Sequence, residues 1–171
     1  QHIFAGNWAD VMRYLMPVLS FMFGVAAATE IRQHFQNIGR IHWRQIVILI
    51  EMSMLFLVGF LPGKMDLVAN AFVSFSCAMQ VQTFRKVDSY AFASTMCIGN
   101  IRSGMEALCA YRQSHNRQIL YKAFHYFGII ILFAFGAGIG SILIPVFNLQ
   151  TIWFSSFLLM VGFFLMFIQE K

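Results

Sequence analysis

A glutamate lies inside an apolar stretch of the chain, where a charged side chain is costly. Glu51 stands about six residues inside the segment Gln45–Leu61, which is roughly 9 Å along a helix. A carboxyl group at that depth is by default a functional residue, suited to binding a cation or carrying a proton. The alternative is a structural glutamate that stays protonated or pairs with an arginine, and the sequence leaves both interpretations open.

Polar side chains also follow one side of the next apolar segment, Leu67–Phe84. A helix turns by about 100° per residue, which groups these polar residues: Asn70, Ser74 and Cys77, with Ser76, Gln80 and Thr83 beside them. The opposite side is apolar: Val68, Phe72, Phe75 and Met79. Such a stripe either lines a solute pathway or forms hydrogen bonds to a neighbouring helix. Its spacing alone does not decide between the two.

A third polar group falls in the segment Phe92–Tyr111. Arg102 and Glu106 are four residues apart, which is the spacing of an ion pair on a helix. The pair Gly99-Asn100 predicts a turn, with a new helix beginning near Ile101. In a re-entrant segment, the unpaired N–H groups at that helix start, together with Arg102, would bind an anion. The alternative is an amphipathic helix at the membrane surface, in which Arg102 and Glu106 only satisfy each other.

The composition predicts that membrane helices hold these residues. Of the 171 residues, 59% are apolar and 11% are charged, with a mean hydropathy of +0.68, whereas a soluble domain carries about 25% charged residues. Five segments are apolar enough to cross a membrane as helices: Tyr14–Ile31, Gln45–Leu61, Leu67–Phe84, Lys122–Ile144 and Leu149–Ile168. The expected fold is all-α, a polytopic protein with a single integral membrane domain over residues 1–171. Basic residues lie between the apolar runs, which argues against a nucleic-acid partner.

The distribution of Lys and Arg predicts that Phe92–Tyr111 does not cross the membrane. Without a crossing, nine basic residues share one side: Arg32, Arg40, Arg44, Arg85, Lys86, Arg112, Arg117, Lys122 and Lys171. Only Arg13 and Lys64 then lie on the opposite side. If the segment crossed the membrane, five basic residues would lie on one side and six on the other. Because basic residues favour the cytoplasmic side, we expect a re-entrant or interfacial broken helix.

Two parts of the sequence resemble each other in a way that predicts an inverted repeat. Phe21–Ala28 aligns with Phe133–Gly140 at an offset of 112, and Val58–Phe60 aligns with Val161–Phe163 at an offset of 103. The charge distribution orients the copies in opposite directions, with the two halves meeting near residues 62–66. Inverted repeats are typical of transporters. Small residues within the copies predict close helix packing: Gly24, Ala28, Gly136 and Gly140.

The sequence predicts no metal site and no cofactor. The five histidines fall in loops or near a helix end, without an HExxH motif or a pair four residues apart: His2, His34, His42, His115 and His125. The three cysteines form no CxxC pair and are expected to pack as small apolar residues: Cys77, Cys97 and Cys109. No nucleophile stands at a plausible spacing from a base, so we do not expect an enzyme.

Residues in the second half of the chain carry a resemblance to a known family: Gln80, Arg85, Gly99, Asn100, Arg102 and Glu106. The chain resembles the YoaK family of uncharacterised bacterial inner-membrane proteins over nearly its whole length. It departs from that family at Ile98, where a hydroxyl residue is usual. The resemblance implies about six spans, of which one, with a first Gly-Asn motif, would precede Gln1. It also implies a multi-pass location in the bacterial inner membrane.

The function that fits these features is a transporter or channel for a small-molecule or anionic solute, with the lipid bilayer as surroundings. The predicted pathway residues are Glu51, Asn70, Ser74, Gln80, Asn100, Arg102 and Glu106. Glu51 is the expected coupling residue. The alternative is a non-transporting assembly or regulatory subunit, in which the same polar residues only pack helices together. The sequence leaves the oligomeric state open, a homo-oligomer included.

Overall fold

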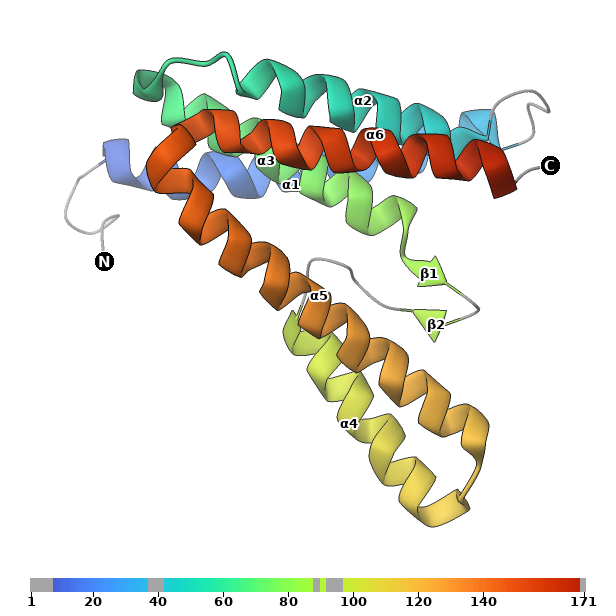
Figure 1. Cartoon of the computed structure of the whole chain (residues 1–171). Helices are drawn as coiled ribbons and strands as arrows, with labels where there is room; N and C mark the ends of the chain where they lie inside the picture. Colours follow the sequence, from blue (N-terminus) through green and yellow to red (C-terminus); the bar gives the residue numbers. More distant parts are fainter. Residues whose placement is uncertain (1–7, 37–41, 88–89, 92–96, 170–171) are drawn as a thin grey trace. The chain divides into compact units, whose positions relative to one another are not determined.

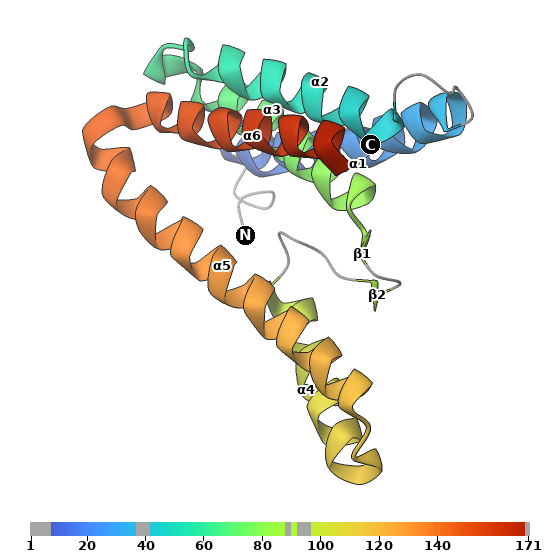
Figure 2. The same cartoon turned by 45° about the vertical axis from the view of Figure 1, so that its right-hand side comes forward.

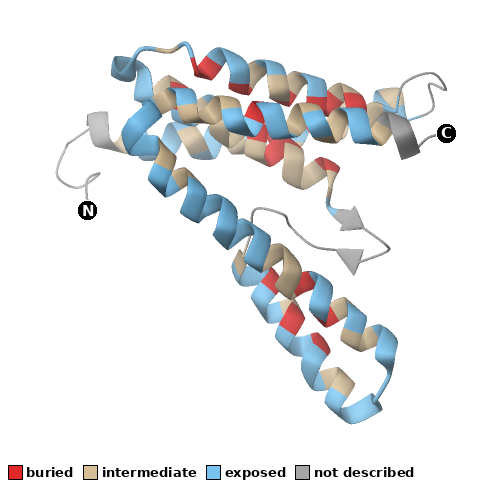
Figure 3. Ribbon diagram, in the orientation of Figure 1, coloured by how far each residue is buried: buried red, intermediate tan, exposed pale blue. Residues whose placement is uncertain are grey.

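The computed structural model describes residues 8–36, 42–87, 90–91 and 97–169 of the chain. The chain divides into two compact units, one of residues 1–83 and 147–171 and the other of residues 84–146. Each unit has buried side chains of its own, as the red residues in Figure 3 show.

The first unit is built from long helices joined by short 3-10 turns (Figure 1). In chain order its elements are α1 (Trp8–Phe35), α2 (Trp43–Val58), η1 (Gly63–Met65), α3 (Asp66–Thr83), η2 (Asn148–Thr151) and α6 (Ile152–Gln169). Local signals set the helix starts. The imidazole Nδ1 of His42 accepts a hydrogen bond from the N–H of Arg44 (3.3 Å), and Asp66 places a carboxylate in the first turn of α3, where the helix dipole favours it.

A glycine permits the close approach of α1 to α3. A Cβ atom on Gly24 would lie 2.5 Å from the carbonyl oxygen of Phe75 and 2.8 Å from the Cβ of Ala78. One turn further along α1, Ala28 is buried in the core cluster that includes Met79 of α3. Small residues at this spacing let two helix backbones come together, which is the contact that the sequence pattern predicts for Gly24 and Ala28.

α6 is held against α2 by side-chain donors that bind backbone carbonyls. The indole N–H of Trp153 donates to the carbonyl oxygen of Phe56 (3.2 Å), and the hydroxyl of Ser156 donates to that of Met52 (3.1 Å). The indole of Trp153 also lies where a Cβ atom on Gly59 would be. A larger residue at position 59 would therefore push α6 away from α2.

The second unit is a helical hairpin preceded by a short strand pair (Figures 1 and 2). Its elements are β1 (Lys86–Val87), β2 (Tyr90–Ala91), α4 (Cys97–Ser114) and α5 (Arg117–Phe147). The strands are antiparallel, with Lys86 paired to Ala91. Helix α4 buries a stripe of small residues and Asn100 at helical spacing, and the ring of Phe127 lies close to Gly104 within this stripe.

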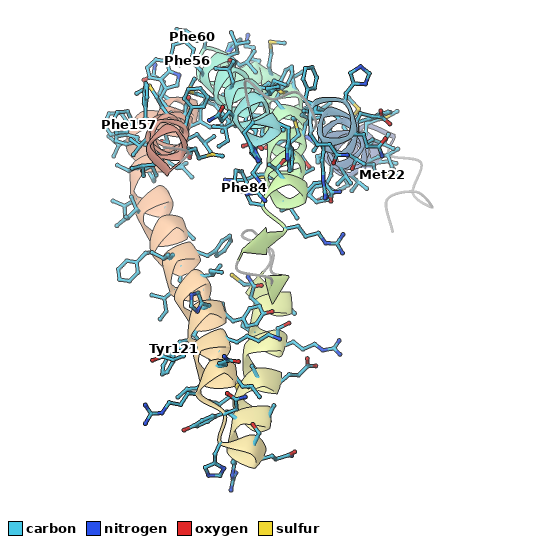
Figure 4. The ribbon with its side chains drawn as sticks, turned by 90° about the vertical axis from the view of Figure 1, so that its right-hand side faces the viewer. Met22, Phe56, Phe60, Phe84, Tyr121 and Phe157 are labelled. Atoms are coloured by element: carbon cyan, nitrogen blue, oxygen red, sulfur yellow. The ribbon has the colours of Figure 1, made fainter. Side chains whose placement is uncertain are left out.

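Large apolar side chains point outward from both units. Exposed Met, Leu, Ile, Val and Phe residues greatly outnumber the buried ones among the residues described, whereas Gln45 and Glu51 are among the largest fully buried side chains. In Figure 4, Met22 of α1 and Phe157 of α6 point away from the other helices of their unit. Two stretches, Val11–Phe35 and Arg117–Met166, are long and apolar enough to cross a membrane. The second stretch takes in both α5 and α6.

The helical parts of the expected fold are confirmed, with one correction. All five segments expected to be apolar helices are helical. The break predicted at Gly99-Asn100 is wrong, because α4 begins at Cys97 and continues through this pair to Ser114. Asn100 already belongs to the buried stripe of α4, so packing maintains the helix there. Residues 92–96 of that segment lie outside the described residues.

The contact at Gly24 makes the first prediction. Gly24→Ala should lower the free energy of unfolding by about 1–3 kcal/mol, because the added methyl group meets the backbone of α3 and cannot be accommodated without a shift. Unfolding would be followed by tryptophan fluorescence during an SDS titration in mixed micelles. Gly162→Ala in α6 is the control, since a Cβ atom there meets no described atom within 4 Å. Equal stability of the two variants would contradict the close α1–α3 contact.

Candidate functional site

The buried carboxyl group of Glu51 is the centre of the candidate site. Glu51 lies near the middle of α2, a helix of 16 residues, and its exposed fraction is 1%. Its Oε1 atom is buried and has no hydrogen-bond partner among the described residues. An unpaired buried carboxylate is costly unless it is protonated or binds a cation. Neither an arginine nor a lysine of the described residues forms an ion pair with Glu51, so the arginine-paired alternative finds no support.

Other unpaired polar atoms are buried on the neighbouring helix α3. The hydroxyl oxygens of Ser76 and Thr83 are both buried and have no hydrogen-bond partner in the described part of the chain. Cys77, next to Ser76, is close enough to Glu51 for the two groups to interact electrostatically. Buried polar groups normally find partners, so each of these atoms has unused hydrogen-bonding capacity inside the first unit.

The remaining polar residues of α3 divide between packing and exposure. The hydroxyl of Ser74 donates to the carbonyl oxygen of Pro17 in α1 (2.7 Å), and the amide of Gln82 donates to the hydroxyl of Thr29 in α1 (3.1 Å). Both bonds hold α3 to α1, which is the use that polar residues commonly have between apolar helices. Asn70 is exposed and Gln80 is half-buried. The stripe predicted from the sequence is thus partly a packing surface.

A pocket of about 380 Å³ lies between α2 and α6. Its walls come from both helices: Met52, Ser53, Phe56, Trp153, Ser156, Phe157 and Met160. The polar atoms in these walls already have partners, since Ser53 donates to the carbonyl oxygen of Leu49 and Ser156 to that of Met52. The pocket is therefore apolar and offers no charged group to a polar solute.

The predicted site residues of α4 lie in the second unit, whose placement relative to Glu51 is not determined. Arg102 and Glu106 form the ion pair that their spacing predicts, with 2.8 Å between Nε and Oε1, and both side chains are exposed. The hydrogen bond to Glu106 raises the pKa of Arg102, which is charged at any physiological pH. Since α4 begins at Cys97, the helix start that was expected to bind an anion does not coincide with Arg102.

Sequence reasoning identified Glu51 but did not identify the other buried polar groups of the first unit. Gln45, six residues before Glu51 on α2, is 1% exposed, and its place at the edge of an apolar run does not predict this burial. Ser76 and Thr83 belonged to the predicted stripe, but spacing alone could not show that they are buried without partners. Among the described residues no three His, Cys, Asp or Glu side chains gather in a way that could hold a metal ion.

Comparison with known proteins gives one family. The family model described as "Protein of unknown function (DUF1275)" matches residues 1–165, which is nearly the whole chain. No curated protein and no solved structure matches. An uncharacterised family is also what the sequence resemblance implied.

Replacement of Glu51 makes the second prediction. Glu51→Leu should raise the free energy of unfolding by about 1–3 kcal/mol, because it removes a buried oxygen that lacks a partner and keeps an apolar side chain of similar size. The measurement is an SDS titration of the purified protein in mixed micelles. A loss of stability would contradict this and would favour a structural glutamate.

Two serines supply a matched control for that measurement. Ser76→Ala removes a buried hydroxyl without a partner and should leave stability unchanged or raise it slightly. Ser156→Ala removes the bond to Met52 and should cost about 0.6 kcal/mol, the average for such bonds between membrane helices. If Ser76→Ala lowered the free energy of unfolding more than Ser156→Ala did, the hydroxyl of Ser76 would have to form a hydrogen bond, which would contradict this account.

Proposed function

Because this chain belongs to the DUF1275 family of proteins of unknown function, we propose a function from its own residues. The chain is an integral membrane protein that moves a small solute, and Glu51 is the group that couples the movement to a proton or another cation. The single observation that carries the proposal is the full burial of this carboxyl group, with an unpaired oxygen, in an apolar helical unit. Ionisable residues inside membranes usually mark such pathways.

The surface of the molecule supports a location in the membrane. Exposed large apolar side chains cover α1, α5 and α6, and a surface of this kind is stable only in lipid or against another protein. The resemblance to the YoaK proteins leads us to place the chain in the bacterial inner membrane as a multi-pass protein. Helices α1, α2, α3, α5 and α6 are the proposed spans, with α2 short for a span at 16 residues.

Helix α4 is proposed to stay on the cytoplasmic side. It carries Arg102, Glu106 and Arg112, and charged side chains are costly inside a membrane. The charge distribution supports the same arrangement, because it leaves most basic residues on one side. With α4 on that side, the two halves of the chain run in opposite directions, as the proposed inverted repeat requires. The packing role predicted for Gly136 and Gly140 stays a prediction, because α4 does not reach them within their unit.

The proposed pathway runs beside Glu51 along α3. Cys77 lies near Glu51, and the half-buried Gln80 and exposed Asn70 are available to a solute. Ser74 is engaged with the backbone of α1, so its contribution is to position α3. The alternative, an assembly or regulatory subunit, requires no water in this region. Access of water to Cys77 therefore separates the two functions without knowledge of the solute.

Thiol labelling of Cys77 makes the third prediction. In a protein with Cys97 and Cys109 replaced by Ser, a membrane-impermeant methanethiosulfonate should modify Cys77 from at least one side of sealed vesicles. The reaction depends on contact with water, where a thiolate can form. Labelling would be read from intact mass after quenching at successive times.

Leu49 supplies the matched control. It lies two residues before Glu51, so at a similar depth, and its side chain is exposed on the surface of the unit. In a variant with all three native cysteines replaced, Leu49→Cys should face lipid and react about tenfold more slowly than Cys77, or not at all. If Cys77 is as unreactive as Leu49→Cys from both sides, the transport proposal is contradicted and the assembly subunit is favoured.

A further inference from the structure

Two arginines lie over one tryptophan where α1 ends and α2 begins. The Cζ atom of Arg32 is 5.7 Å from the centre of the Trp43 ring, and that of Arg44 is 5.6 Å from it. Trp43 itself packs against the buried cluster formed by Ala28, Val47 and Met79, so the ring has a fixed position. Each guanidinium group is therefore within the distance of a cation–π interaction with a ring of fixed position.

Within the described part of the chain, no carboxylate pairs with either charge. Neither Arg32 nor Arg44 forms an ion pair with an Asp or Glu of the described residues, and the ion pair of Arg102 with Glu106 belongs to the other unit. The Nε atom of Arg44 is buried and has no hydrogen-bond partner in the described part of the chain. Buried donors of a charged group normally have an acceptor, so this donor is available to a bound group.

The surroundings add positive potential to this cluster. Trp43 and Arg44 are the first two residues of α2, whose first turn contains no acidic residue, so the positive end of the helix dipole is not neutralised there. A tryptophan at a helix end is typical of the level of lipid headgroups, and the basic residues of this loop fall on the side predicted to be cytoplasmic. Planar guanidinium groups match the oxygens of a phosphate better than ammonium groups do.

We propose that Arg32, Trp43 and Arg44 form a binding site for the phosphate of an anionic phospholipid headgroup. The two guanidinium groups donate to the phosphate oxygens, the Arg44 Nε gains an acceptor, and Trp43 keeps both arginines in place. This proposal rests on the membrane location proposed above and is independent of solute transport, so an unreactive Cys77 would leave it intact.

Native mass spectrometry of the full chain in a neutral detergent tests the site, with phosphatidylglycerol as the probe. The wild-type protein should bind one phosphatidylglycerol more tightly than further copies, and more tightly than phosphatidylcholine. The variant R32Q/R44Q should bind that first lipid about thirtyfold more weakly, because each arginine near an anionic headgroup contributes about one kilocalorie per mole. W43L should also bind it more weakly, since both arginines lose the ring that holds them.

The matched control is R112Q/R117Q, which removes the same number of exposed positive charges from the other unit. It should keep the affinity of the wild type. R32K/R44K is the control for misfolding, because it keeps both positive charges. It should bind with intermediate affinity and elute from a gel-filtration column as the wild type does. Equal weakening by R112Q/R117Q and R32Q/R44Q would overturn the proposal, since net charge alone would then explain binding.

Two further arms identify the source of the phosphate. Inorganic phosphate at millimolar concentration should displace little phosphatidylglycerol from the wild-type protein. Full displacement that depends on Arg32 and Arg44 would assign the site to a soluble phosphate compound and overturn the lipid assignment. Equal affinity for phosphatidylcholine and phosphatidylglycerol would overturn the preference for an anionic headgroup.

Discussion

The outward orientation of the large apolar side chains is the constraint on which the rest of the molecule depends. With apolar residues facing out, the contacts between helices are left to small residues and to donors that reach backbone carbonyls. Gly24 permits the approach of α1 to α3, and Gly59 leaves space for Trp153 of α6. Ser74 and Ser156 then bind carbonyl oxygens of neighbouring helices. The unit is held by close approach and hydrogen bonds, with a small apolar core around Met79.

Within such a unit, a polar group without a partner is conspicuous because most of the others have one. Among the described residues, Oε1 of Glu51 and the hydroxyls of Ser76 and Thr83 have no hydrogen-bond partner, whereas Ser74 and Gln82 bond to α1. A buried carboxyl group that lowers stability is retained when activity needs it. The guanidinium groups over Trp43 are a similar case at the end of the helices, where we propose that a lipid headgroup supplies the anion.

The structural features that could be predicted from the sequence are those that a single segment determines by itself. Five helices followed from apolar runs, and Glu51 stood out because it lies inside one of them. The partner of Ser74 could not be predicted, because it depends on which helix lies beside α3. The start of α4 was misplaced because Gly99-Asn100 is locally a turn signal, while burial of Asn100 favours a helix. The Arg32, Trp43 and Arg44 cluster joins residues on two helices, so neither segment alone reveals it.

The central claim is that the chain is a multi-pass membrane protein with Glu51 inside a spanning helix. The most direct test is to determine on which side of the membrane each end of α5 lies. Single cysteines at Arg117 and Asn148, in a full-length protein without native cysteines, would be labelled with an impermeant maleimide in sealed vesicles of each orientation. The proposed arrangement predicts that position 117 reacts only from the cytoplasmic side and position 148 only from the outside. Labelling of both positions from the same side would contradict it.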